Sequence, residues 1–157
     1  MFNRIKVIVF LLLLFSCKNE KGKAKDVNDD RNPRVIYLKS IADSLYHRND
    51  FISAIRYFDT LIQLDPGRGE YYYKQGYSYD MVYKRPELEQ SIKDYHKSIE
   101  LGYKVADSYY NLGLSYMFVK DSIAIIYFKK TLELDPKNPD AIYLIQQCKM
   151  RLKNKSY

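Results

Sequence analysis

The sequence predicts an all-α fold, an α-solenoid of three helix-turn-helix repeats closed by a C-terminal capping helix. The triplet Leu-Asp-Pro ends at Pro66 and again at Pro136, and 136 − 66 = 70 residues is two periods of 35. The same spaced phrase of residues precedes both triplets. Self-similarity at a period of about 20 to 50 residues is typical of stacked repeats, which work as binding surfaces more often than as active sites.

The repeated phrase describes the second helix of each unit. It places a small residue first, an aromatic residue four positions on, and further residues seven and ten positions on, so that all four share one helical face. The small residue lets a neighbouring helix approach closely, and the aromatic ring fills the space between units. The three copies begin at Ala54, Ser91 and Ala124 and carry the aromatic residues Phe58, Tyr95 and Phe128.

The first helix of each unit follows a second phrase. Tyr72-x2-Gln75-Gly76-x2-Tyr79 and Tyr109-x2-Leu112-Gly113-x2-Tyr116 are near copies, and Leu38-x2-Ile41-Ala42-x2-Leu45 is a looser one. A glycine inside a helix costs about 1 kcal/mol relative to alanine, so both glycines need a reason such as tight contact with the partner helix. The tyrosines expected in the core are Tyr72, Tyr79, Tyr95, Tyr109 and Tyr116.

These phrases together resemble the tetratricopeptide repeat family, whose pattern W-x2-L-G-x2-Y…A-x3-F…P is matched with Tyr or Leu in place of Trp. The resemblance implies a repeat domain over 35–157. Its predicted parts are repeats at about 35–68, 69–104 and 105–138 and a capping helix at about 139–154.

Residues 1–16 are predicted to be a lipoprotein signal peptide. Arg4 and Lys6 precede nine apolar residues from Val7 to Phe15, a basic start and short apolar core typical of a secretory signal. The following Cys17 completes a stretch, Leu-Phe-Ser-Cys, that resembles the bacterial lipobox, although Phe15 departs from the small or aliphatic residue usual there. Cys17 is the expected lipidation site; the alternative is an ordinary signal peptide in which this cysteine is incidental.

Residues 17–34 are predicted to be the lipidated cysteine and a disordered, charged tether. From Lys18 to Arg34 the only apolar residues are Ala24 and Val27, too few to bury. Acyl chains such as palmitate on Cys17 would anchor the domain to a bacterial envelope membrane. Lys18, rather than Asp, after the cysteine favours the outer membrane, with the domain facing the periplasm and exposure at the cell surface as the alternative.

Catalysis, cofactors and metals are not expected. His47 and His96 are about 50 residues apart, and neither belongs to a cluster with metal-ligand spacing. No glycine-rich phosphate loop or nucleophile elbow is present in the sequence. The formal net charge of +7 comes from interspersed acidic and basic residues, and nucleic acid is not expected as a partner outside the cytoplasm. Function is therefore expected in a surface.

An envelope protein or peptide segment is the expected partner, bound in the concave groove that first helices line in stacked helix pairs. Tyrosine offers a large rigid contact area, and methionine adapts to varied shapes. The convex face and the ends of the stack remain alternatives, because 17 tyrosines in 157 residues put several on any face. The predicted partner-binding residues are Lys39, Asp43 and Tyr46 in the first repeat, Tyr73, Tyr77 and Met81 in the second, and Tyr110, Leu114 and Phe118 in the third.

Two other functions are open. One is a carbohydrate-binding accessory lipoprotein that stacks sugars on Tyr73, Tyr77 and Tyr110, although the Trp usual in such sites is absent from the chain. The other is an enzyme with an unrecognised site at His47 or His96.

One binding mode of the family is expected to be absent. Some tetratricopeptide proteins clamp the C-terminal carboxylate of chaperones with a set of Lys and Asn residues. Lys39 can stand for one lysine of that set, but Asp43 takes the place of the asparagine and Asp107 that of a second lysine. Two carboxylates there would repel a carboxylate ligand.

Overall fold

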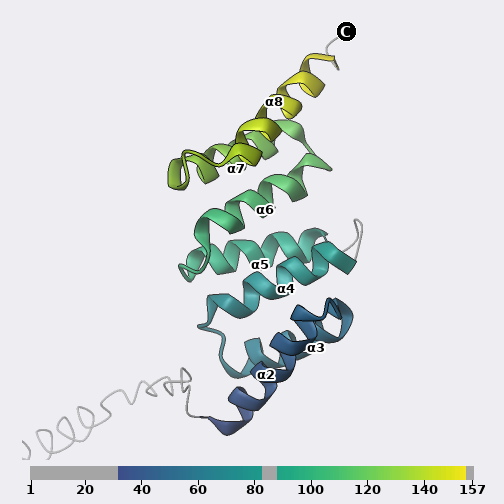
Figure 1. The fold of residues 1–157 in the computed structure, drawn as a ribbon, viewed down its shortest axis with the longest axis vertical. Coiled ribbons are helices and arrows are strands. Elements are labelled where there is room, and N and C mark those ends of the chain that lie inside the picture. Colours follow the sequence, from purple (N-terminus) through teal and green to yellow (C-terminus); the bar gives the residue numbers. More distant parts are fainter. Residues whose placement is uncertain (1–31, 83–87, 155–157) are drawn as a thin grey trace, which may run out of the picture.

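A computed structural model describes residues 32–82 and 88–154 of the chain. The predicted signal peptide, Cys17 and nearly all of the predicted tether lie outside these residues. The described part consists of helices without strands, which confirms the predicted all-α class. Figure 1 shows these helices as an elongated stack. They are α2 (Pro33–His47), α3 (Phe51–Leu64), α4 (Gly69–Val82), α5 (Leu88–Glu100), α6 (Val105–Met117), α7 (Asp121–Leu134) and α8 (Pro139–Asn154).

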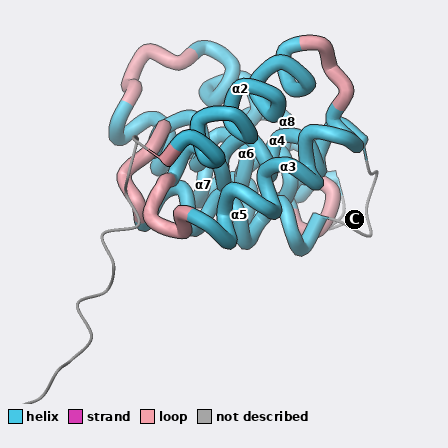
Figure 2. The backbone as a smooth tube through the Cα atoms, turned by 90° about the horizontal axis from the view of Figure 1, so that it is seen from below, coloured by secondary structure: helices cyan, strands magenta, loops and turns pink. Residues whose placement is uncertain are grey.

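The helices pack in chain order. The pairs α2·α3, α4·α5 and α6·α7 form the three repeats, and α3 with α4 and α5 with α6 join one repeat to the next. Helix α8 packs on α7, and α4 also contacts α6 directly. Viewed along the stack in Figure 2, the first helices of the pairs lie on one side and the second helices on the other. The arrangement is the predicted α-solenoid with a closing helix.

The glycines of the first helices allow close approach within each pair. A Cβ atom on Gly113 would lie inside van der Waals contact of the Phe128 ring. A Cβ atom on Gly76 would lie 3.2 Å from Asp94 Cβ and 3.3 Å from Tyr95 Cε1. In the first repeat Ala42 and Phe58 are both fully buried in one core cluster. The small residue of each first helix is thus matched to the aromatic residue of its partner helix.

The first helices α4 and α6 bury residues outside the positions of the repeated phrase. Of the five tyrosines expected in the core, Tyr95 is fully buried, and the other four are half-buried. Tyr71, which has no phrase position, is fully buried instead, in one cluster with Phe58 and Leu61 of α3. The reason is that α4 and α6 pack against two second helices, their own and that of the preceding repeat. Tyr72, Tyr79 and Tyr109 are therefore less buried than predicted, and Tyr116 packs at the margin of the core cluster around Phe128.

The middle repeat has a polar interior. Helix α5 buries Ser91, Asp94 and Ser98 beside Tyr95. Asp94 Oδ1 accepts a hydrogen bond of 2.9 Å from Gln90 Nε2, while Asp94 Oδ2 is buried with no partner among the described residues. Burial, helped by the nearby carboxylate of Asp59, raises the pKa of Asp94 to about 7. The least regular copy of the repeat therefore holds a buried acid whose charge is poorly compensated.

We predict that Gly113→Ala destabilises the fold by about 1–3 kcal/mol, because the added methyl group must displace the Phe128 ring. Thermal unfolding measures the loss. Gly67→Ala is the matched control, since a Cβ atom there would meet Asp65 Oδ1 at 3.9 Å, an ordinary contact. Equal unfolding temperatures for Gly113→Ala and the parent would contradict the close approach of α6 and α7.

We predict that Asp94→Asn raises stability at pH 8 by about 1–3 kcal/mol, the usual cost of an uncompensated buried polar group. The pKa of Asp94 in the folded state lies above its ordinary value of 3.8. The contribution of this carboxyl group to the free energy of unfolding is therefore fully present below pH 3.8. That contribution is lost as the pH rises to about 7. The gain should therefore shrink between pH 8 and pH 4 in denaturant unfolding.

Asp107→Asn is the control for this experiment, because Asp107 is exposed and its replacement removes no buried carboxyl group. A destabilised Asp94→Asn variant at pH 8 would show that the Asp94 carboxylate is satisfied in the fold.

Candidate protein-binding face

Eight of the nine predicted partner-binding residues lie on first helices. Those on α2, α4 and α6 are half-buried, apart from the exposed Met81, and the exposed Phe118 lies directly after α6. The tyrosines of neighbouring repeats meet: the ring centroids of Tyr46 and Tyr77 are 5.7 Å apart. We call the surface formed by these nine residues the first-helix face.

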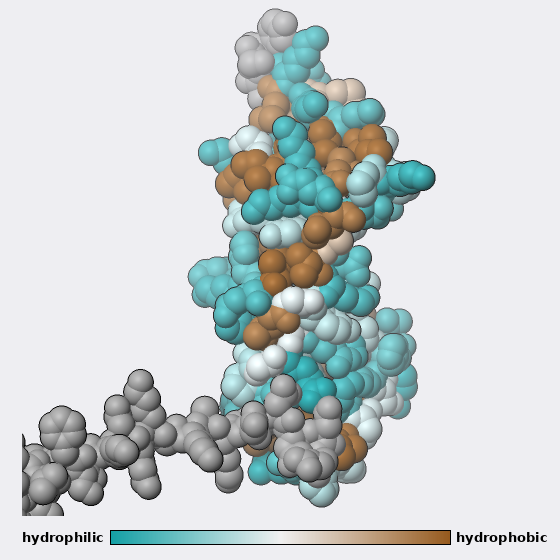
Figure 3. All heavy atoms as spheres, turned by 90° about the vertical axis from the view of Figure 1, so that its left-hand side faces the viewer, coloured by the Kyte–Doolittle hydropathy of each residue, from teal (hydrophilic) through white to brown (hydrophobic). Residues whose placement is uncertain are grey.

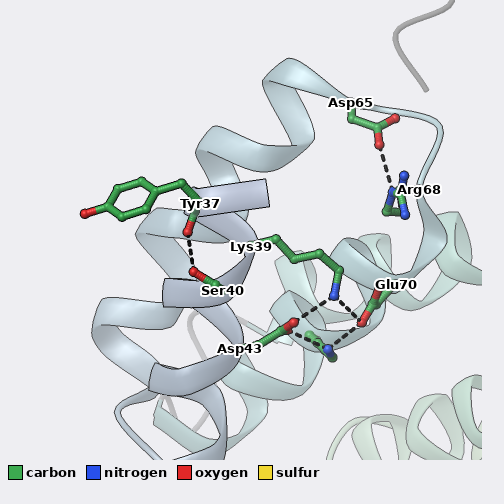
Figure 4. Close-up of polar contacts among 8 residues, drawn as sticks. Tyr37, Lys39, Ser40, Asp43, Asp65, Arg68 and Glu70 are labelled. Carbon is green, nitrogen blue, oxygen red and sulfur yellow. Dashed lines mark hydrogen bonds and ion pairs between the residues drawn. The ribbon is translucent and has the colours of Figure 1, made fainter. Parts of the chain in front are cut away.

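Four charged side chains join α2 to α4 on the first-helix face (Figure 4). Lys39 Nζ donates to Asp43 Oδ2 at 2.7 Å and to Glu70 Oε1 at 3.2 Å. Lys74 Nζ donates to Asp43 Oδ1 at 2.7 Å and to Glu70 Oε1 at 2.5 Å. We call these four residues the ion quartet. Lys74 and Glu70 were not predicted, because each lies 31 residues from its partner on α2 and belongs to neither phrase.

The ion quartet is electrically balanced, with two lysines and two carboxylates. Burial opposes the charge of each group, yet the hydrogen bonds and ion pairs from the lysines hold the pKa values of Asp43 and Glu70 below their ordinary values. The same contacts outweigh burial at Lys39 and raise its pKa. Each of these lysines is therefore committed to two carboxylates of its own chain.

The tyrosine rings of the first-helix face pack against other aromatic rings of the chain. Tyr46 makes edge contacts with Phe51 and Phe58. Tyr73 lies 6.0 Å from Tyr95 and 5.9 Å from Tyr103, and its burial raises its pKa to about 12.

The two remaining tyrosines of the first-helix face also pack against aromatic rings. Tyr77 also contacts Phe51, and Tyr110 lies 5.8 Å from Phe128. Lys104 Nζ lies over the Tyr73 ring at 5.0 Å from its centroid.

Exposed apolar side chains of the first helices include three at the carboxyl ends of α4 and α6. Met81 is 51% exposed, Phe118 73% and Val119 62%. Val119 was missed because the prediction followed a helical stripe and stopped at the helix end. Large apolar side chains this exposed are the groups that gain most from contact with a partner.

A second aromatic cluster joins α6 to α7. Tyr127 of α7 stacks on Tyr109 and Tyr116 of α6, with centroid distances of 6.3 and 5.2 Å. Lys130 Nζ lies over the Tyr109 ring, and the Tyr127 hydroxyl is 3.3 Å from His96 Nε2. Since Tyr127 is stacked on both rings, we assign this cluster to the packing of α6 on α7. His96 belongs to it as a packing residue.

Two further observations concern the described residues alone. Residues 32–82 and 88–154 contain no group of three His, Cys, Asp or Glu side chains placed to hold a metal ion. No helix within those ranges combines the length and apolar character needed to cross a bilayer.

Comparison with known proteins supports the same fold. No family model matches the chain. Serine/threonine-protein phosphatase 5 of Mus musculus is 27% identical over 126 residues, and that of Homo sapiens is 26% identical over 126 residues. Each match covers 79% of this chain and 24% of the relative, so the chain spans about a quarter of the length of these curated relatives. The match falls on the tetratricopeptide repeat region of the phosphatases.

Solved structures are similar over most of the chain. The first repeat domain of Spaghetti (RPAP3), bound to the HSP90 peptide SRMEEVD, gives a TM-score of 0.67 at 17% identity and covers 76% of this chain and 93% of that one. The second such domain of human RPAP3, in complex with the HSP70 peptide SGPTIEEVD, gives 0.65 at 20% identity, with 73% and 94% covered. The Sgt2 domain from Aspergillus fumigatus gives 0.65 at 16% identity, with 79% and 82% covered. The fold is that of tetratricopeptide repeat domains.

Proposed function

We propose that the chain is a non-enzymatic adaptor that binds a partner protein or peptide segment on its first-helix face. The observation that carries the proposal is the exposure of Met81, Phe118 and Val119 at the carboxyl ends of α4 and α6, two first helices that contact each other. Two of the similar solved domains are bound to peptides, which supports a peptide segment as the ligand.

The partner segment is apolar where it meets the first-helix face, and its terminal carboxylate is not the recognised group. A ligand carboxylate would have to break ion pairs of Lys39 or Lys74 that are already made at 2.7 Å. It would also lie beside Asp43 and Glu70, which repel it. Apolar contact at the exposed Met81 and Phe118 carries no such cost.

The chain is also proposed to be a lipoprotein of a bacterial envelope, anchored through Cys17 to the outer membrane and facing the periplasm. The proposal rests on the sequence around this cysteine. The basic start, the nine apolar residues from Val7 to Phe15 and the polar stretch after Cys17 fit a cleaved signal and a tether. Several acyl chains on one cysteine give stable anchoring, whereas a single chain binds marginally.

The adaptor proposal predicts that Met81→Ser/Phe118→Ser strongly reduces capture of the partner. In-cell crosslinking and purification of the chain should recover one discrete envelope protein with the parent and at least about tenfold less with the variant. Both side chains are exposed, so the variant should keep the helical circular dichroism and unfolding temperature of the parent.

Ile52→Ser/Ile126→Ser is the matched control, because these residues are 52% and 53% exposed on second helices. The control variant should capture the partner normally, and an acidic peptide such as SRMEEVD should not displace the partner. Loss of capture with the control and not with Met81→Ser/Phe118→Ser would place binding on the other face and contradict the proposal.

The anchoring proposal predicts that Cys17→Ser moves the chain from the membrane fraction to the soluble fraction and stops incorporation of a palmitate analogue. Cys148→Ser is the control. Cys148 is fully buried, so this substitution should leave membrane association and acyl labelling unchanged. A parent chain that takes up no acyl label would rule out lipidation.

A further inference from the structure

Helix α2 leaves open a face that the later first helices bury. The small residue of each first helix is Ala42, Gly76 or Gly113, and the positions five before, one before and two after it form one helical stripe. On α4 and α6 every residue of this stripe is buried, with at most 3% of its surface exposed. These residues are Tyr71, Gln75 and Ser78 on α4, and Ser108, Leu112 and Ser115 on α6.

The same stripe on α2 is Tyr37, Ile41 and Ser44. Tyr37 is 65% exposed, Ser44 is exposed and Ile41 is half-buried. The reason for the difference is that α4 and α6 are each covered by the second helix of the preceding repeat, α3 or α5. Among the described residues no helix precedes α2, so its stripe forms an open end of the stack, opposite α8 (Figure 1).

The exposed charges of α2 and its C-cap are basic. Arg34 and Arg48 are both exposed and extend the stripe, since positions 34, 37, 41, 44 and 48 alternate by three and four residues. The acid of α2, Asp43, is half-buried in the ion quartet. The open end is therefore a basic surface with Tyr37 at its centre.

Helix α3 adds a third arginine beside this stripe. The exposed Arg56 lines a hollow between α2 and α3, together with Leu38, Tyr57 and Thr60. The exposed acid of α3, Asp59, is directed towards α4, where its Oδ1 accepts a hydrogen bond of 2.7 Å from Gln75 Nε2. Arg56 therefore adds to the basic character of the open end.

Apolar exposure alone does not distinguish the two ends of the stack. Tyr143 on α8 is 59% exposed, and in Figure 3 apolar side chains gather over the half of the stack that contains α8. Charge and chain path do distinguish them. Helix α8 exposes the acid Asp140 among its bases. The chain enters the stack at Asn32, the N-cap of α2, which lies 32 − 17 = 15 residues after Cys17.

The chain itself does not offer a good cover for the open end. A second copy that packed its α2 antiparallel about Ile41 would bring Arg34 of each copy to Arg48 of the other, and like charges repel. Residues 18–31 contain only Ala24 and Val27 as apolar residues, which gives them little to bury against Tyr37. The occupant that fits is anionic and tolerates an aromatic ring at its boundary.

We propose that this open end rests on an anionic phospholipid surface, with Tyr37 and Ile41 at the level of the headgroups and Arg34, Arg48 and Arg56 beside the phosphates. Tyrosine is enriched at membrane–water interfaces, and arginine is attracted to anionic lipid. The inference rests on the proposed anchor at Cys17. As a random coil, residues 18–31 reach roughly 20 Å, which keeps the α2 end close to the membrane.

The contact orients the adaptor. Each arginine near an anionic surface strengthens binding by about fivefold, so three arginines hold the domain weakly unless the anchor raises their effective concentration. With α2 on the membrane, α8 lies at the far end of the stack (Figure 1). The repeats that carry Met81 and Phe118 then lie beyond the first repeat, where a periplasmic partner reaches them.

Nitroxide labels at the two ends test the contact. The lipidated mature chain is reconstituted into vesicles of phosphatidylglycerol and phosphatidylcholine, with Tyr37→Cys or Tyr143→Cys in a Cys148→Ser background. Electron paramagnetic resonance compares collisions of each label with lipid-soluble oxygen and with a water-soluble nickel reagent. We expect a shift towards oxygen at position 37 alone, and a smaller shift in vesicles of phosphatidylcholine only. Circular dichroism establishes that each variant is folded.

Charge variants test the arginines without the anchor. The unlipidated chain of residues 18–157 keeps every described residue, and its cosedimentation with the same vesicles measures the binding constant. Arg34→Gln/Arg48→Gln should weaken binding by about 25-fold, because each arginine contributes about fivefold. Lys129→Gln/Lys149→Gln removes the same charge from exposed positions on α7 and α8, and this matched control should bind nearly as the parent does.

Two results would overturn the inference: a label at position 37 that is as accessible to nickel as the label at 143, or equal losses of binding in the two charge variants. In the first case a crosslink from position 37 to an acidic protein in cells would identify that protein as the occupant. Failure of the anchor alone is distinguishable, because the chain then takes up no acyl label while the cosedimentation experiment still decides the contact.

Discussion

The structure depends on the close approach of the two helices within each repeat. A small residue on the first helix, Gly113 or Gly76, lets the second helix lie so near that an added methyl group would meet Phe128 or Asp94. This contact sets the geometry of one helix pair, and the same geometry repeated along the chain separates first helices from second helices (Figure 2). The first-helix face follows from that separation. It is a property of the stack, and no single repeat contains it.

The polar groups of the interior make the three repeats unequal. The α2–α4 junction is closed by the ion quartet, in which every charge has an opposite neighbour. The middle repeat instead buries Asp94 with one oxygen unpaired, and burial also raises the pKa of Asp80, which accepts a hydrogen bond from the Tyr95 hydroxyl at 2.8 Å. Stability at this repeat therefore falls as the pH rises towards neutrality. The acidic groups of the quartet have the opposite dependence, since their pKa values are lowered.

The fold could be predicted from the sequence because the helices and turns obey local rules. Spacing of three to four residues identifies each helix, and proline and small residues mark the turns and close contacts. Burial is less local. Tyr71 is buried and Tyr72 is half-buried because a first helix packs between two second helices, which the phrase does not reveal.

The candidate site could be predicted in part. The helical stripe predicted Tyr73 and Tyr110 as partner-binding residues, and in the fold their rings contact Tyr95 and Phe128. The ion quartet could not be predicted, because its two halves lie 31 residues apart and meet only through stacking. Cys17 remains a prediction, since it lies outside the described residues.

The most direct test of the account asks which face of the stack meets another protein in the cell. A photo-crosslinking amino acid is placed at Phe118, next to α6, in one strain and at Ile52, on α3, in another; the two positions are 73% and 52% exposed. We predict a discrete adduct with one envelope protein from position 118 and none from position 52. An adduct from position 52 alone, or equal adducts from both positions, would contradict the claim that the first-helix face is the binding surface.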